Sequence, residues 1–176
     1  VQSRTSLRAA YAGLPAGTKR VLVPTMGALH DGHAALMRAG RVLAGPGGHV
    51  TASIFVNPTQ FGANEDLAKY PRSLEADVDV CAGEGVDLVF APNVEGIYRG
   101  GDPLVTIDPG AMGTLLEGAV RPGHFRGVLT VVHKLLHLTG ADVLLLGEKD
   151  YQQLVLVKRM VFDLDLVFVV VRGEAL

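Results

Sequence analysis

Short apolar runs alternate along this chain with longer segments in which apolar residues recur at helical spacing. Such alternation is typical of a parallel sheet whose strands are joined by helices. The predicted strands are residues 20–23, 50–56, 88–91, 143–146 and 166–171. The predicted helices lie near residues 34–43, 74–83, 126–138 and 151–162. Because residues 54–56 and 143–146 are apolar throughout, we predict an α/β fold with helices on both faces of the sheet.

Two segments between the predicted elements have a character of their own. Residues 103–109 are a candidate for a further short strand. Residues 61–72 form a long polar connection, which is either a plain surface loop or a lid over a site. The connection follows a predicted strand, and loops placed there often carry function, so the lid is the favoured interpretation.

Polar residues cluster directly after three of the predicted strands. The clusters are residues 30–33, 57–60 and 147–150. In an open parallel sheet the ligand crevice lies beyond the carboxyl ends of the strands. We therefore expect the three clusters to face one cavity if their strands are neighbours in the sheet.

The segment Pro24-Thr-Met-Gly-Ala-Leu-His-Asp-Gly-His33 joins a predicted strand to a predicted helix. Free backbone N–H groups and the positive end of the helix dipole favour a phosphate at such a point. His30 and His33 add donors that titrate near neutral pH and suit a phosphoryl group that gains negative charge. The chain has no G-x-x-x-x-G-K-[ST] and no G-x-G-x-x-G, so this pattern predicts nucleotide chemistry without a P-loop. The alternative is that Gly27 and Gly32 serve only the turn, while both histidines are solvated.

Length and composition fit one globular domain with small-molecule partners. The chain has 176 residues, of which 48% are hydrophobic, and a formal net charge of -2 with no basic run. Nucleic-acid binding normally shows a clustered Lys/Arg footprint, so we expect no nucleic-acid partner. Cys81 is the only cysteine, which excludes an intrachain disulfide and favours a buried, inert thiol. No apolar run reaches transmembrane length, so we expect a cytoplasmic protein with no membrane partner.

Three histidines outside the clusters are interpreted as structural. Residues 133–137 imitate the H-E-x-x-H zinc motif, but Lys134 stands where a metalloprotease needs its general base. Two histidines on one helix face are therefore expected there. His49, which follows a pair of glycines, is interpreted as part of a loop.

Acidic and turn-rich residues elsewhere are given no direct chemistry. Asp77 and Asp79 fall within a predicted helix and are expected on its solvated face, with a Mg²⁺-linked role as the alternative. Residues 117–118 and 121–124 are rich in turn formers, and no chemistry is assigned to them.

Five motifs, taken in order, resemble those of the pantoate–β-alanine ligase (pantothenate synthetase) family. They are Pro24-Thr-Met-Gly-Ala-Leu-His-Asp-Gly-His33, Phe55-Val-Asn-Pro-Thr-Gln-Phe61, Tyr70-Pro-Arg72, Gly123-His-Phe-Arg-Gly-Val128 and Gly147-Glu-Lys-Asp-Tyr-Gln-Gln153. The H-x-G-H form alone indicates only the wider HxGH nucleotidyltransferase superfamily. The resemblance implies a Rossmann-like domain that makes pantoyl adenylate and pyrophosphate from pantoate, ATP and Mg²⁺. β-Alanine then displaces AMP to give pantothenate, and the resemblance also implies a homodimer.

The resemblance implies an ATP site built from the first and last motifs. Its residues are Met26, Gly27, Ala28, Leu29, His30, Asp31, Gly32, His33, Gly147, Glu148, Lys149, Asp150 and, by local alignment, Val171. His30 and His33 are expected to act on the α-phosphate as imidazolium donors, with His33 as the proton donor. Lys149 is expected to neutralise the leaving phosphates as a compact point charge. The resemblance identifies no Mg²⁺ ligands.

The same resemblance places the acceptor substrates beside two neutral amides. Gln153 is expected to bind pantoate, and Gln60 to bind pantoate and β-alanine, because an amide bonds hydroxyls and carboxylates without adding a charge. Asn57 is expected at this site or directly behind it, with a plain Asn-Pro turn as the alternative. From the residues alone, Asp150 and Gln153 have the spacing of a helix N-cap and its capping-box partner, which remains the alternative for both.

Residues 1–176 are interpreted as a nucleotide- and pantoate-binding catalytic domain. In the family, a Ser-Ser-Arg-Asn segment that grips the ATP phosphates and a small C-terminal domain come next, and the sequence stops before them at Leu176. Two other interpretations remain open. One is another HxGH adenylyltransferase, and the other is a nucleotide-binding module without catalysis.

Overall fold

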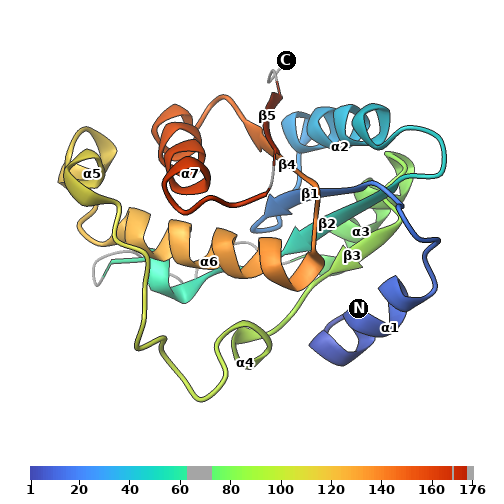
Figure 1. The fold of residues 1–176 in the computed structure, drawn as a ribbon, viewed down its shortest axis with the longest axis horizontal. Helices are drawn as coiled ribbons and strands as arrows, with labels where there is room; N and C mark the ends of the chain where they lie inside the picture. The colour runs from blue at the N-terminus through green and yellow to red at the C-terminus, as the bar shows by residue number, and fades with distance from the viewer. Residues whose placement is uncertain (63–72, 168, 174–176) are drawn as a thin grey trace.

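Five parallel strands form one sheet in the computed structural model, which describes residues 1–62, 73–167 and 169–173. The strands are β1 (Arg20–Thr25), β2 (His49–Ile54), β3 (Leu88–Phe90), β4 (Val143–Gly147) and β5 (Val169–Gly173). Their order across the sheet is β3-β2-β1-β4-β5, and every neighbouring pair is parallel (Figure 1). This is a doubly wound α/β arrangement, in which the winding reverses between β1 and β4.

Helices cover both faces of the sheet, as predicted (Figure 1). One face is covered by α2 (Asp31–Ala44) and α3 (Leu74–Gly83). The other face is covered by α1 (Arg4–Ala12), α4 (Val94–Ile97), α6 (His124–Thr139) and α7 (Tyr151–Asp163). Shorter helical turns are η1 (Pro58–Gln60), η3 (Gly110–Thr114) and α5 (Glu117–Val120).

Alternating strand residues divide the core into two layers. In β1, Val21 and Val23 pack on the side of α2, whereas Leu22 packs on the side of α6. The residues of β4 alternate in the same way. Both faces of these strands are therefore buried, which explains why residues 21–23 and 143–146 are apolar without a break.

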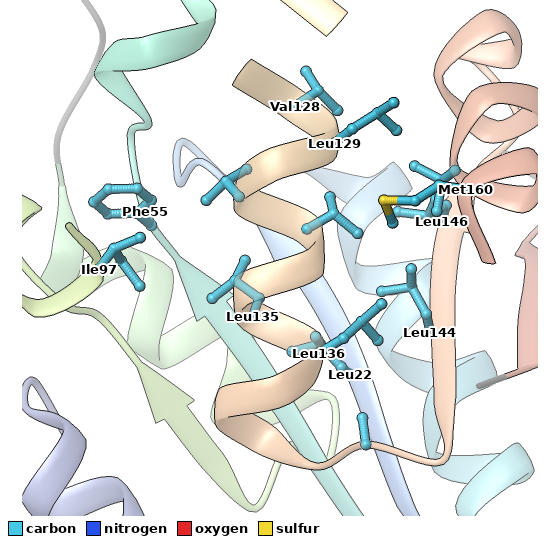
Figure 2. Packing of buried hydrophobic residues seen from close by; sticks show 14 of the residues in the cluster. Leu22, Phe55, Ile97, Val128, Leu129, Leu135, Leu136, Leu144, Leu146 and Met160 are labelled. Carbon is cyan, nitrogen blue, oxygen red and sulfur yellow. The ribbon is translucent and has the colours of Figure 1, made fainter. Parts of the chain in front are cut away.

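Helix α6 forms the centre of the larger layer. Figure 2 shows Leu136 of α6 close to Leu22 of β1 and Leu144 of β4, and all three side chains are fully buried. Truncation of one such side chain to Ala typically costs about 2–5 kcal/mol. This packing holds α6 against the sheet, where residues between Val128 and Leu135 also form a wall of the candidate site.

Most predicted elements are confirmed, with boundaries that shift by a few residues. Helix α3 has the predicted bounds, and α2, α6 and α7 extend the predicted helices by one to three residues at one or both ends. The predicted bounds of the last strand, residues 166–171, were wrong, since β5 begins at Val169 and ends at Gly173. Asp165 has a φ of 49°, and the Leu166 amide donates to the carbonyl of Val161. Leu166, the first residue of the predicted strand, therefore belongs to a tight turn after α7. Helix α1 was not predicted.

Three other predictions need correction or fall outside the described structure. Residues 103–109 form no strand, and Ile107 is tied instead to Thr130 of α6 by a backbone-to-side-chain hydrogen bond of 3.0 Å. His49 is the first residue of β2, where its backbone pairs with Arg20 of β1, and it is 9% exposed with its ring against Tyr11. Of the predicted lid, residues 63–72 lie outside the described residues, so the lid stays a prediction.

Candidate functional site

A cavity of about 330 Å³ opens at the carboxyl ends of β1 and β4, where the winding of the sheet reverses. Its walls contain these predicted site residues: Met26, Gly27, Ala28, His30, Gly32, His33, Gln60, Gly147, Lys149, Asp150 and Gln153. Apolar side chains of α6, including Val128 and Val131, complete the wall. The three polar clusters therefore meet in one cavity, as predicted from their positions after the strands.

Other predicted site residues do not line this cavity. Leu29 packs into the smaller core layer, and Val171 of β5 packs against the same layer. Asp31 lies in the first turn of α2, and Glu148 forms an ion pair with Arg172 at 3.0 Å. Asn57 lies behind the cavity wall, as described below.

The turn between β1 and α2 is held by Asp77 of α3. The Asp77 carboxylate accepts hydrogen bonds from the amides of Ala28 at 3.0 Å and Leu29 at 2.8 Å. Gly27 and Ala28 have φ angles of 85° and 52°, and a Cβ atom at Gly27 would lie 2.8 Å from the Asp77 carboxylate. The prediction that Asp77 is solvated was wrong, since the residue is 3% exposed and fixes the cavity's main turn.

Two histidines form the N-terminal cap of α2. Nδ1 of His30 accepts a hydrogen bond from the Gly32 amide at 3.1 Å, and Nδ1 of His33 accepts one from the His30 amide at 3.3 Å. A backbone amide can only donate, so both rings carry no proton on Nδ1 in this arrangement. A neutral ring then bears its proton on Nε2, and the two rings are inclined at 55° to each other with centroids 4.2 Å apart.

The charge state of His33 follows from its surroundings. Burial lowers the pKa of His33, and the neighbouring ring of His30 lowers it further. Asp77 acts in the opposite direction but does not outweigh burial. A lowered pKa favours the neutral form of His33 near neutral pH, in which the ring donates through Nε2–H, and the predicted role of His33 as the proton donor stays a prediction.

The opposite side of the cavity is formed where β4 meets α7. Lys149 is exposed at the cavity wall and has no ion-pair partner in the described part of the chain. Asp150 occupies the N-cap position of α7, but its side chain makes no capping hydrogen bond. The capping-box alternative for Asp150 and Gln153 is therefore not realised in the structure, and both side chains remain at the cavity.

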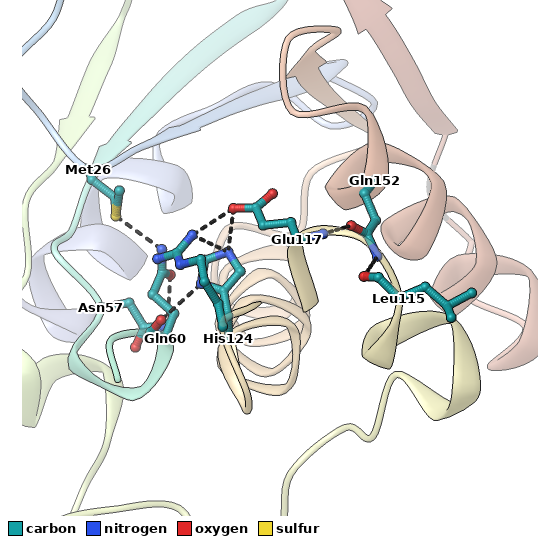
Figure 3. Close-up of polar contacts among 8 residues, drawn as sticks. Met26, Asn57, Gln60, Leu115, Glu117, His124 and Gln152 are labelled. Carbon is teal, nitrogen blue, oxygen red and sulfur yellow. Dashed lines mark hydrogen bonds and ion pairs between the residues drawn. The ribbon is translucent and has the colours of Figure 1, made fainter. Parts of the chain in front are cut away.

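Gln60 is held from two sides at the end of η1 (Figure 3). Its Oε1 accepts a hydrogen bond from Asn57 Nδ2 at 3.1 Å, and its Nε2 donates to Met26 Sδ at 3.1 Å. An amide has two donor hydrogens and two acceptor lone pairs. One of each therefore remains for a ligand in the cavity.

Asn57 is committed to partners within the protein. It is 1% exposed, and its Nδ2 also donates to the carbonyl of Gly127 at 3.1 Å. Its Oδ1 accepts hydrogen bonds from Tyr98 at 2.8 Å and from Thr59. Asn57 thus holds both η1 and the Gln60 amide in place, which includes the Asn-Pro turn foreseen as its alternative role.

Several residues around the site were missed because their partners are distant in sequence. Glu117, Arg121 and His124 form a polar cluster that reaches the Gln60 backbone, and Tyr98 supports Asn57. The Gly123–Val128 motif was noted, but a turn-rich composition gives no sign of a buried histidine.

The structure also describes the cysteine and the histidine pair that the sequence singled out. Cys81 is buried, and burial raises the pKa of its thiol to about 11, so it is an inert core residue. His133 and His137 lie one turn apart on α6 with ring centroids 4.2 Å apart. Among the described residues, no three His, Cys, Asp or Glu side chains converge to hold a metal ion. None of the described helices is long and apolar enough to cross a membrane.

A doubly wound parallel sheet, with an H-x-G-H helix cap and a lysine facing one cavity at its switch point, defines a nucleotidyltransferase-type α/β domain. Within that class the chain belongs to the pantoate–β-alanine ligase family. The family model described as pantoate-beta-alanine ligase matches residues 1–175.

Pantothenate synthetases are similar to this chain in both sequence and structure. One from a Nocardioides species is 62% identical over 156 residues, which cover 87% of this chain and 47% of the relative. One from Streptomyces coelicolor is 58% identical over 147 residues, covering 84% of this chain and 44% of the relative. The chain thus spans about half the length of these curated relatives.

Two solved structures are similar over nearly the whole chain. The pantothenate synthetase of Thermus thermophilus has a TM-score of 0.88 and 47% identity, covering 99% of this chain and 60% of that one. The pantoate-beta-alanine ligase of Francisella tularensis, complexed with beta-gamma ATP and beta-alanine, has a TM-score of 0.92 and 39% identity. That match covers 99% of this chain and 66% of the Francisella chain.

Proposed function

We propose that this chain carries the site at which pantoate is adenylated by ATP and then joined to β-alanine to give pantothenate. One observation carries the proposal: a single cavity brings together the His30–His33 cap, Lys149 and the amides of Gln60 and Gln153. The cavity therefore holds both donors suited to phosphate and neutral groups suited to a hydroxy acid. The ATP and β-alanine named with the Francisella structure support the same assignment.

The ATP side of the cavity has the groups that adenylate formation requires. A pantoate carboxylate oxygen attacks the α-phosphorus, and the bond to the β-phosphate oxygen breaks to release pyrophosphate. His30 and His33 would donate through Nε2 to the α-phosphate as it gains charge, and the positive end of the α2 dipole would add to the attraction. Lys149 would neutralise the departing pyrophosphate, because it is a cation with no other partner in the described structure.

The acceptor side of the cavity suits pantoate and β-alanine. Gln60 keeps one N–H and one lone pair for a ligand, and Gln153 has no hydrogen-bond partner among the described residues. In the second step, the β-alanine amine attacks the acyl carbon of the adenylate and AMP leaves. Neutral amides bind the hydroxyl and carboxylate groups without attracting the nucleophilic amine as an anion would.

Mg²⁺ is proposed to enter with ATP. A protein usually holds Mg²⁺ through one or two carboxylates, substrate phosphates and water. The described residues offer no cluster of three ligands, but Asp150 stands at the cavity wall beside Lys149. Asp150 is therefore the residue here that would contact the ion, with the phosphates as its main ligands.

The remaining features are proposals drawn from the family. Residues 1–176 are proposed to form the nucleotide- and pantoate-binding domain of a cytoplasmic enzyme that works as a homodimer. Leu29, Asp31, Glu148 and Val171 do not line the cavity described here, so a contact from them to ATP would use their backbone or the cavity rim.

The acceptor site is tested by calorimetry with Gln60→Ala and Gln153→Ala. Each change is expected to weaken pantoate binding by about 1–3 kcal/mol, because a buried ligand group loses its partner. ATP binding should stay near normal. Unchanged pantoate affinity in both variants would remove the two amides from the site.

Pyrophosphate release distinguishes the main proposal from its rivals. Release that depends on pantoate is expected of this family, whereas another HxGH adenylyltransferase would act on phosphorylated acceptors such as phosphopantetheine or nicotinate mononucleotide. Apart from Lys149, no described Lys or Arg lines the cavity for such a phosphate, whereas the amides of Gln60 and Gln153 do line it, which favours pantoate. ATP binding without any release would indicate a binding module.

A further inference from the structure

A chain of polar contacts runs behind the cavity wall and has no part in the proposed chemistry (Figure 3). It starts at the carbonyl of Gln60, which accepts a hydrogen bond from Nδ1 of His124 at 2.9 Å. Nε2 of His124 accepts a hydrogen bond from Nη1 of Arg121 at 3.1 Å, and the same nitrogen of Arg121 donates to Glu117 Oε1 at 2.7 Å. His124 is 6% exposed, so its tautomer is set by these two partners.

The chain of contacts continues from Glu117 to the first turn of α7. The Glu117 amide donates to Gln152 Oε1 at 3.0 Å, and Gln152 Nε2 donates to the carbonyls of Met112 and Leu115 at 3.0 and 2.8 Å. Gln152 directly precedes Gln153, the amide on the opposite cavity wall. We call Glu117, Arg121, His124 and Gln152 the α5 bridge.

Helix α5 is seated tightly, which limits how far the α5 bridge can move. Gly118 of α5 is buried, and a Cβ atom there would collide with the carbonyl oxygen of Gly113. The same Cβ would lie 3.2 Å from the ring of Phe125 in α6. Helix α5 therefore packs closely between η3 and α6 at Gly118.

We propose that the α5 bridge positions the two pantoate-binding amides, setting Gln60 and Gln153 at a fixed separation across the cavity. The inference rests on the proposed function, because it concerns the same pantoate site. Within the described residues, no member of the α5 bridge lines the cavity, so these are positioning residues that act through Gln60 and Gln153. A binding group displaced by about 1 Å loses much of its effect, which makes such support functionally important.

Two substitutions of His124 separate positioning from general support. In His124→Asn, an amide N–H stands near the place of Nδ1 and keeps the hydrogen bond to Gln60. In His124→Gln, the amide reaches the place of Nε2 and leaves the Gln60 carbonyl without its buried donor. We expect His124→Gln to raise the KM for pantoate about tenfold with little change in the KM for ATP, and His124→Asn to stay within about twofold of wild type.

Two further variants test the Gln152 end of the α5 bridge and provide a control on α6. Gln152→Ala should also raise the KM for pantoate selectively, because the turn that carries Gln153 loses its tie to α5. Arg126→Gln breaks an exposed ion pair to Asp108 on the same helix as His124 and should leave both KM values unchanged.

Side-chain amide NMR of Gln60 in the full-length protein provides a readout that does not depend on pantoate. The Gln60 resonance should move or broaden in His124→Gln and remain in place in His124→Asn. A His124→Gln variant with a lower Tm but with an unchanged Gln60 resonance and pantoate KM would overturn the proposal. The α5 bridge would then only stabilise the fold. If the wild type fails to use pantoate, the proposed function is wrong. In that case an unchanged Gln60 resonance in His124→Gln would still overturn the proposal that the α5 bridge positions Gln60.

Discussion

At the scale of single residues, each histidine of the α2 cap serves two purposes with its two ring nitrogens. Nδ1 of His30 and of His33 accepts a backbone hydrogen bond and fixes the ring. Nε2 is then the nitrogen that can face a phosphate. The rings are thereby oriented before a ligand binds, which is the condition under which a fixed donor lowers a reaction barrier.

Replacing either cap histidine should slow the first chemical step. His30→Ala or His33→Ala in a full-length protein is expected to reduce adenylate formation by roughly 100-fold or more, measured as pantoate-dependent pyrophosphate release. ATP affinity should change much less. His137→Ala is a matched control, because it disrupts a second histidine pair with the same 4.2 Å ring separation, on α6. Wild-type rates in both cap variants would refute the assignment.

The lowered pKa of His33 predicts a loss of stability in acid. The unfolded chain has a histidine with a pKa near 6.5, whereas the folded His33 has a lower pKa and resists protonation. As the pH falls below about 6.5, the unfolded state takes up more protons, so the free energy of unfolding decreases. His33→Asn keeps an acceptor near Nδ1 but does not titrate.

Denaturant unfolding at about pH 7.5 and about pH 5.5 measures this contribution. The wild type should lose more stability between the two values than His33→Asn does. Burial also lowers the pKa of His49 and His133, so the variant should retain part of the dependence. An equal loss in both proteins would mean that His33 does not resist protonation.

At the scale of elements, α3 supports the turn between β1 and α2 from the same face of the sheet as α2. Asp77 accepts two amide hydrogen bonds with its two oxygens. Asp77→Asn places an NH₂ group against one of these donors, and is expected to destabilise the fold by about 1–3 kcal/mol and weaken ATP binding. Asp79→Asn, on the exposed face of the same helix, should be neutral in both denaturant unfolding and calorimetry. Equal behaviour of the two variants would contradict the role of Asp77.

The sequence predicted elements well where their burial is regular. The strands around Leu22 and Leu144 are apolar on both faces, and α3 begins and ends as its pattern predicts. The start of β5 was misplaced because the turn at Asp165 includes Leu166, which is as apolar as the residues of a buried strand. The local sequence pattern cannot show which part of an apolar run pairs with a neighbouring strand.

The sequence predicted the members of the site better than their supports. The three polar clusters follow strands, so their meeting at one cavity could be predicted from position, whereas Gln153 was added only by the resemblance to the family, and the roles of all these residues stay predictions. Asp77 was missed because its partners lie 48 and 49 residues away, and His124 because Gln60 is 64 residues away. A charged or polar residue on a predicted helix looks solvated until its distant partner is known.

At the scale of the whole molecule, the site depends on the order of the strands. Residues of β1 and β4 lie side by side although more than a hundred positions separate them in sequence, with Val21 opposite Val143. The cap of α2 and the start of α7 therefore reach one cavity from opposite halves of the chain. A nucleotide bound there would bridge the two halves.

Residues 1–176 expressed alone are expected to separate binding from turnover. They contain both core layers and the whole described cavity, so they should fold cooperatively and bind ATP in calorimetry. The curated relatives are about twice as long as the matched region, and phosphoryl transfer depends on several charges placed around the phosphates together. Pantoate-dependent turnover is therefore expected to be roughly a thousandfold or more below that of a full-length relative. Turnover within about tenfold of that relative would show that the cap histidines, Lys149 and the two amides suffice for catalysis.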